Sequence, residues 1–108
     1  MYRSGMPPLR MTTPRIFVLQ ALLTDPDQER YGFDLAHQAG LEPGTIYPIL
    51  VAFENVGWLE SRAEDIDVHT EGRPRRRYYK LTPDGTASAR QALAPRKTSR
   101  TASGRLAW

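Results

Sequence analysis

Apolar residues recur along this 108-residue chain in blocks with helical spacing, separated by residues that favour turns. The pair Thr13-Pro14, an N-cap hydroxyl followed by a proline, predicts the start of a first helix. That helix continues to about Leu23 and is apolar on nearly every side. We therefore expect one of its faces to pack on the core and another to meet a later helix or a second chain.

Two further helices are predicted in close succession. The first runs from about Tyr31 to Gln38, and Gly40 is placed to end it in a left-handed conformation. The second ends at Gly57. Its apolar positions recur at helical spacing: Ile46, Ile49, Leu50, Phe53 and Val56.

After Gly57 the pattern changes to the period-two alternation of strands. Strands are predicted over residues 58–63 and 75–81, joined by a polar loop. Alternation places Leu59, Tyr79 and Leu81 on the inward face. A last helix over residues 83–94 repeats the cap-and-proline start, here with Thr82-Pro83.

The predicted fold class is therefore mainly α with a small β-hairpin. The elements form a winged helix-turn-helix with three helices, a two-stranded wing and a C-terminal helix. The predicted domain organisation has a flexible N-terminus over residues 1–12, one winged-helix domain over residues 13–94, and a basic mobile tail over residues 95–108.

Composition narrows the class of protein. The length fits a single hydrophobic core, and no apolar run approaches the roughly 18 residues of a membrane span. No signal peptide is visible, so a cytoplasmic protein is expected. The chain has no cysteine, which excludes disulfides and thiolate metal sites.

The net charge of +3 conceals a strong segregation of charge. Residues 1–15 hold three basic residues, residues 73–80 hold five, and five more follow residue 86, all without an acid. Residues 16–72 carry eleven acids against two basic residues. Positive charge gathered on a predicted wing and at both ends favours a polyanionic partner.

The predicted wing is the main candidate for binding double-stranded DNA. It carries arginines with no acid beside them in the sequence, and arginine forms paired charge-assisted hydrogen bonds with phosphate. Strand alternation would send Arg75 and Arg77 to the face opposite Arg76. The predicted phosphate or minor-groove contacts are Arg73, Arg75, Arg76 and Lys80.

The third helix is the predicted reader of the major groove. Gly44 permits close approach of the backbone, while Thr45 and Tyr47 offer hydroxyl groups to phosphates or base edges. No basic residue occurs from Leu41 to Gly57, so readout would depend on neutral hydrogen bonds, methyl contacts and DNA shape. The alternative for Tyr47 is a packing tyrosine that bridges two helices.

Four sequence motifs occur in an order typical of one known family. The first three are Tyr31-Gly32-Phe33, Gly44-Thr45-Ile46-Tyr47-Pro48 and Gly57-Trp58-Leu59-Glu60-Ser61. The fourth has two halves, Gly72-Arg73-Pro74 and Tyr78-Tyr79-Lys80-Leu81-Thr82, separated by three residues. Over about half its length the chain thus resembles the short, winged-helix PadR-like transcriptional regulators. Family members often have basic residues near the positions of Val51 and Ala52, which this chain lacks.

The resemblance implies a transcriptional regulator, usually a repressor, that binds a two-fold operator as a homodimer. It also implies dimerisation through the first and last helices and places the segment containing Thr45 and Tyr47 at the DNA. Whether a small-molecule effector exists is left open by the sequence. Two other functions also remain open: a winged-helix module for protein–protein interaction and a sequence-neutral DNA-binding protein.

No pattern of an enzyme or a cofactor site is found. His37 and His69 are isolated, and neither has a ligand partner at metal spacing. The chain has no Gly-rich phosphate loop and no nucleophile–base pair. We therefore expect a protein that binds without catalysis and without a cofactor or metal.

Overall fold

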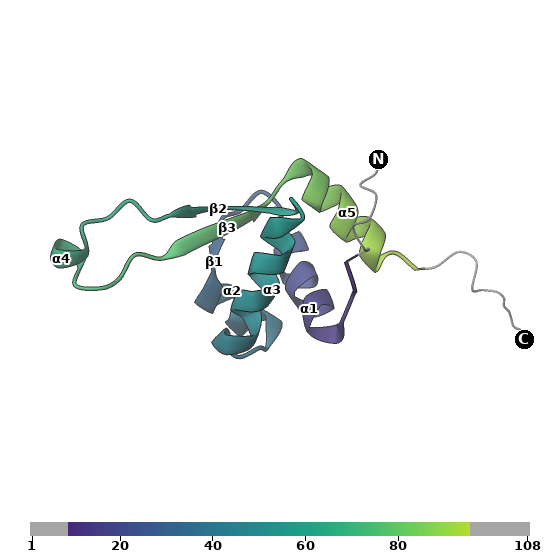
Figure 1. Ribbon diagram of the computed structural model, residues 1–108, viewed down its shortest axis with the longest axis horizontal. Coiled ribbons are helices and arrows are strands. Elements are labelled where there is room, and N and C mark those ends of the chain that lie inside the picture. The colour runs from purple at the N-terminus through teal and green to yellow at the C-terminus, as the bar shows by residue number, and fades with distance from the viewer. Residues whose placement is uncertain (1–8, 96–108) are drawn as a thin grey trace, which may run out of the picture.

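The computed structural model describes residues 9–95 of the chain. Three helices form the body, a long hairpin runs away from it, and the last helix lies on the other side (Figure 1). The mainly helical winged-helix fold is as predicted. The elements in order are α1 (Thr13–Leu23), β1 (Arg30–Tyr31), α2 (Gly32–Ala39), α3 (Pro43–Asn55), β2 (Leu59–Ala63), α4 (Val68–Glu71), β3 (Arg77–Leu81) and α5 (Pro83–Leu93).

The sheet has three strands where the sequence predicted two. Its order is β1-β3-β2, and both pairings are antiparallel. The additional strand, β1, pairs Arg30 with Tyr79 and Tyr31 with Tyr78. A strand of two residues has no alternation to detect and forms only because the distant β3 supplies its partner.

Element ends differ from the predictions by one or two residues. The cap of α1 is Thr12, whose hydroxyl accepts a hydrogen bond from the Arg15 N–H at 3.4 Å, so the predicted cap at Thr13 was one residue late. Thr82 caps α5 as predicted and accepts from the Gly85 N–H at 2.9 Å. The short α4 in the wing loop was not predicted, and Asp67 caps it.

The core forms where α1, α2 and α3 meet the sheet. Its largest fully buried side chain is Phe53, and Leu59, Tyr79 and Leu81 point inward as alternation predicted. In α2 the inward residues are Leu35 and Ala36. Gly40 and Gly57 follow α2 and α3 with φ of 73° and 81°, as their predicted role of ending helices requires.

A glycine allows α5 to pack closely against the start of the wing. A Cβ atom on Gly85 would lie 1.9 Å from the Trp58 carbonyl oxygen. The Trp58 ring in turn stacks on Phe53, with ring centroids 5.5 Å apart. α5 also contacts α1, which joins the two helices that the sequence singled out for dimerisation.

Parts of the predicted organisation lie outside the described residues. These are most of the flexible segment over residues 1–12 and all but the first residue of the basic tail over residues 95–108. Within residues 9–95, no helix has the length and apolar character of a membrane span.

Candidate nucleic-acid interface

Helix α3 divides cleanly into a buried and an exposed face. Its buried residues, Ile46, Ile49, Leu50 and Phe53, follow helical spacing and anchor it in the core. Pro48 is the sixth residue of α3, beyond the first turn, because the Ile46 N–H already bonds the Glu42 carbonyl; it therefore leaves the Gly44 carbonyl without its helical donor. The exposed residues are Gly44, Thr45, Tyr47, Pro48, Val51 and Asn55. A helix face held by a rigid core can be presented to a groove, and without a basic residue it would read bases only by neutral hydrogen bonds and apolar contacts.

Tyr47 packs between two helices and is also exposed enough to contact a partner. Its ring packs on the backbone of Gly32 at the start of α2, since a Cβ atom there would lie 2.5 Å from the Tyr47 Cε1 and hydroxyl oxygen. The side chain nevertheless remains 41% exposed. Tyr47 is thus a contact between two helices that still presents polar and aromatic surface to a partner.

An open hollow of about 450 Å³ lies where α2, α3 and the wing come together. It brings Tyr47 to the predicted wing arginines, although 26 or more residues separate them in the chain. None of its lining residues is acidic. They are Tyr31, Gly32, Phe33, Tyr47, Arg73, Pro74, Arg75, Arg76 and Arg77.

Strand alternation predicted that Arg75 and Arg77 would lie on the face opposite Arg76. This prediction is wrong, because all three arginines line the same hollow. Arg75 and Arg76 precede β3, which begins at Arg77, so strand alternation does not apply to them. Lys80 is not among the lining residues. It borders a separate hollow together with Glu29, Glu60, Ser61 and Arg62.

Glu64 is the main site residue that the sequence did not reveal. Its carboxylate accepts hydrogen bonds from both terminal nitrogens of Arg73, at 2.7 and 3.0 Å. It also accepts from the Arg76 N–H at 3.1 Å and the Tyr78 hydroxyl at 3.2 Å. The expectation that no acid neutralises the wing arginines is therefore wrong for Arg73, which has Glu64 as its ion-pair partner.

The remaining wing arginines have different neighbours. Arg77 donates a hydrogen bond to the Ser61 hydroxyl at 3.0 Å. The Arg76 guanidinium lies over the Tyr31 ring, 4.5 Å from its centroid, an arrangement that leaves its charge unneutralised. Among the described residues, no acid lies within ion-pair distance of Arg75 or Arg76. Arg77 bonds a neutral hydroxyl and has no acid within ion-pair distance among these residues either, so Arg75, Arg76 and Arg77 together supply the free positive charge of the hollow.

The hydrogen bonds to Glu64 predict a distinctive acid sensitivity. The Arg73 guanidinium, followed by the Arg76 N–H and the Tyr78 hydroxyl, lowers the pKa of Glu64 from 4.5 to about 2. A lowered pKa stabilises the fold above pH 4.5, and that contribution disappears as pH falls towards 2. We expect Glu64→Gln to unfold at lower urea concentration than the wild type at neutral pH, with the difference vanishing near pH 2.

Asp65→Asn is the matched control for this measurement. Asp65 is the neighbouring carboxylate and accepts no hydrogen bond from the described residues. Its substitution should leave the pH dependence of the urea midpoint as in the wild type. A constant difference between Glu64→Gln and the wild type from neutral pH down to pH 2 would contradict the assignment.

A buried arginine holds α2 against the sheet. Arg30 is 8% exposed and donates a hydrogen bond to the Asp34 carboxylate at 2.5 Å and another to the Gln38 side chain. Burying an arginine is costly unless its charge is paired, and Asp34 supplies the pair. This interaction fixes the start of α2, which carries Gly32 and Phe33 to the hollow.

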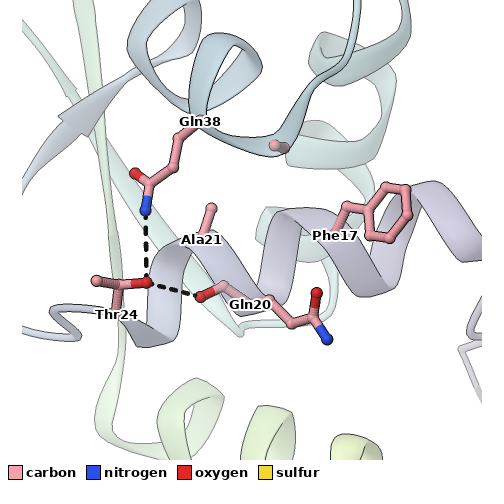
Figure 2. A pocket seen from close by; sticks show the side chains of 6 residues that line it. Phe17, Gln20, Ala21, Thr24 and Gln38 are labelled. Carbon is pink, nitrogen blue, oxygen red and sulfur yellow. Dashed lines mark hydrogen bonds between the residues drawn. The ribbon is translucent and has the colours of Figure 1, made fainter.

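A smaller hollow of about 240 Å³ lies between α1 and α2, on the body of the protein. Figure 2 shows Gln38 and Thr24 at one side and the Phe17 ring at the other. The Gln38 amide donates to the Thr24 hydroxyl at 3.4 Å, and that hydroxyl donates to the Gln20 carbonyl at 3.1 Å. Within the described residues, no cluster of side chains suited to a metal ion occurs in either hollow or elsewhere.

Solved structures of regulators share this fold. A PadR family transcription regulator from Clostridium difficile is 24% identical over 75% of this chain and 83% of that chain, with a TM-score of 0.59. BpsR of Bordetella bronchiseptica, whose DNA binding is regulated by 6-hydroxynicotinic acid, is 18% identical over 84% and 63%, with a TM-score of 0.63. The PcaV transcriptional regulator from Streptomyces coelicolor is 24% identical over 74% and 51%, with a TM-score of 0.58.

These likenesses establish the fold, and the chain spans only about half to two thirds of the length of PcaV and BpsR. Curated protein sequences give no significant match. The family pattern of the PadR-like transcriptional regulators, however, matches residues 18–91. This range includes α2, α3, the whole wing and most of α5. The chain belongs to the PadR-like family of transcriptional regulators.

Proposed function

We propose that this chain is a repressor that binds a two-fold operator as a homodimer and recognises its sequence. One observation carries the proposal: the uncharged exposed face of α3 borders the same hollow as the unneutralised Arg75 and Arg76. The helix would enter the major groove, with Thr45 and Tyr47 at base edges or phosphates and Gly44 allowing close approach. Arg75 and Arg76 would bind phosphates or the adjacent minor groove.

Arg73 and Lys80 have different roles within this proposal. Arg73 is held by Glu64, so we propose that it mainly fixes the shape of the wing and contacts phosphate only at its exposed edge. Lys80 borders a hollow that also contains Glu29 and Glu60. A lysine beside two carboxylates binds phosphate less strongly than an unpaired arginine, and we expect Lys80 to contribute less than Arg75 or Arg76.

The proposed dimer uses α1 and α5, which contact each other in the single chain. Phe17 on α1 is 42% exposed and would add apolar area to this contact. The exposed residues of α5 are small or polar, so this helix would add close packing with little apolar area; they are Pro83, Asp84, Ala87, Arg90, Gln91 and Ala92. Two copies would present two α3 helices to half-sites about one helical turn apart.

The test is binding of the purified chain to the duplex upstream of its own gene, against a scrambled duplex, across a salt series. We expect a preference of ~10³ or more for the native duplex. A second specific candidate, a protein-binding module, is favoured by exposed Phe17 beside the α1–α2 hollow. The absence of duplex binding even at low salt would support that module.

Equal, steeply salt-dependent binding to both duplexes would instead indicate a sequence-neutral DNA-binding protein, because phosphate contacts release counterions whatever the sequence. Deleting residues 95–108 also distinguishes a sequence-neutral DNA-binding protein from the proposed regulator. The deletion should abolish binding by a protein that depends on its basic tail, and it should only weaken binding by the proposed regulator.

A further inference from the structure

Most of the large exposed apolar side chains of the described residues lie on two adjacent helices, α2 and α3. Four large ones are exposed among the described residues, and three of them, Phe33, Tyr47 and Val51, lie on α2 and α3. Phe33 is 62% exposed and lines the wing hollow together with Tyr47. Val51 is 50% exposed and lies one helical turn beyond Tyr47 on the same face. An apolar patch rimmed by charge marks an interaction surface.

The patch has no group that selects guanine. Arginine and lysine are the usual partners of guanine in the major groove, and α3 contains neither. Its one charged residue, Glu54, accepts a hydrogen bond from the Ser61 hydroxyl at 2.7 Å and is thus turned towards β2. Selection of a G·C pair by a charged side chain of α3 is therefore not available to this protein.

The charge around the patch identifies its partner. Arg75 and Arg76 stand at its edge without an acid, which favours a polyanion over an apolar protein surface. Within the polyanionic major groove, the apolar group on the base edges is the C5-methyl of thymine. We propose that Val51 on α3 and Phe33 on α2 read thymine methyl groups in the operator, and that this interaction determines the sequence preference of the patch.

This inference rests on the proposed function. One set of duplexes tests the inference independently of the proposed function. The full chain is first used to enrich a duplex from a random library. That duplex is then resynthesised with deoxyuridine, which lacks the methyl group, at each thymine in turn. We expect about fourfold weaker binding for each methyl group that is read, from the burial of one apolar carbon, with an unchanged salt slope.

Protein variants assign the methyl contact. In Val51→Ala or Phe33→Ala the penalty for deoxyuridine should disappear at the thymine which that side chain reads. Both side chains are exposed, so both variants should keep the wild-type circular dichroism spectrum. Val68→Ala makes the same change as Val51→Ala at the far end of the wing, and it should keep the full penalty (Figure 1).

Three results would overturn the inference, and they can be told apart. An enriched duplex that tolerates deoxyuridine at every thymine would show that the chain reads sequence by other groups, and the proposed function would stand. A library from which no duplex is enriched would show that no base is read, and the proposed function would fail with the inference. A penalty that both Val51→Ala and Phe33→Ala retain would also contradict the assignment.

Discussion

Replacing Arg75 and Arg76 together by alanine should weaken binding to every duplex by roughly 10- to 100-fold at about 0.1 M salt. The two guanidinium groups border the hollow beside α3, and no acid among the described residues pairs with them. Removing one phosphate-binding side chain should flatten the dependence of log K on log salt by about one, so the slope should change by up to about two. Because phosphate contacts carry no sequence information, native and scrambled duplexes should be weakened alike.

The matched control is Lys80→Ala combined with Arg90→Ala. It removes the same charge from a different hollow, which also contains Asp27 and Glu60. We expect a smaller change of slope, because net charge alone acts weakly across a screened distance. An unchanged slope in the Arg75 and Arg76 variant would show that these arginines do not touch DNA. Equal changes in both variants would show that Lys80 and Arg90 together belong to the interface as fully as the wing arginines do.

The sequence predicted those parts of the fold that depend on local chemistry. Thr82 followed by Pro83 sets the start of α5, and Gly57 ends α3 with a positive φ, because caps and left-handed stops act within a few residues. Alternation correctly placed Tyr79 in the core. β1 could not be predicted, since its two residues become a strand only by pairing with β3, nearly 50 residues later.

In the candidate site, too, the sequence predicted what depends on neighbouring residues and missed what depends on distant contacts. Residue types alone identified Tyr47 and the wing arginines as candidate DNA-binding residues, because a basic hairpin and a neutral helix are recognisable locally. The role of Glu64 depends on its side chain meeting Arg73, Arg76 and Tyr78 across the hairpin, 9 to 14 residues away. Arg75 and Arg76 line one hollow because β3 begins only at Arg77, after both of them. The sequence does not determine the start of a strand to within one or two residues, so it could not predict this arrangement.

Gly85→Ala should destabilise the protein by about 1–3 kcal/mol, the usual cost of forcing extra volume into a packed site. For a domain of this size the midpoint of thermal unfolding should fall by roughly 10 °C. The new Cβ atom would lie 1.9 Å from the carbonyl oxygen and 2.7 Å from the Cα of Trp58. These are backbone atoms, so no side-chain rotation relieves the clash, and α5 must move away from the wing.

Gly44→Ala is the matched control, because nothing lies within 4 Å of a Cβ atom at that position in α3. The same chemical change there should leave stability equal or raise it by up to ~1 kcal/mol, since alanine favours helix over glycine. Displacing α5 should also weaken the proposed α1–α5 dimer, which sedimentation at several protein concentrations would detect. A Gly85→Ala protein with wild-type melting and assembly would show that α5 does not pack against Trp58 in solution.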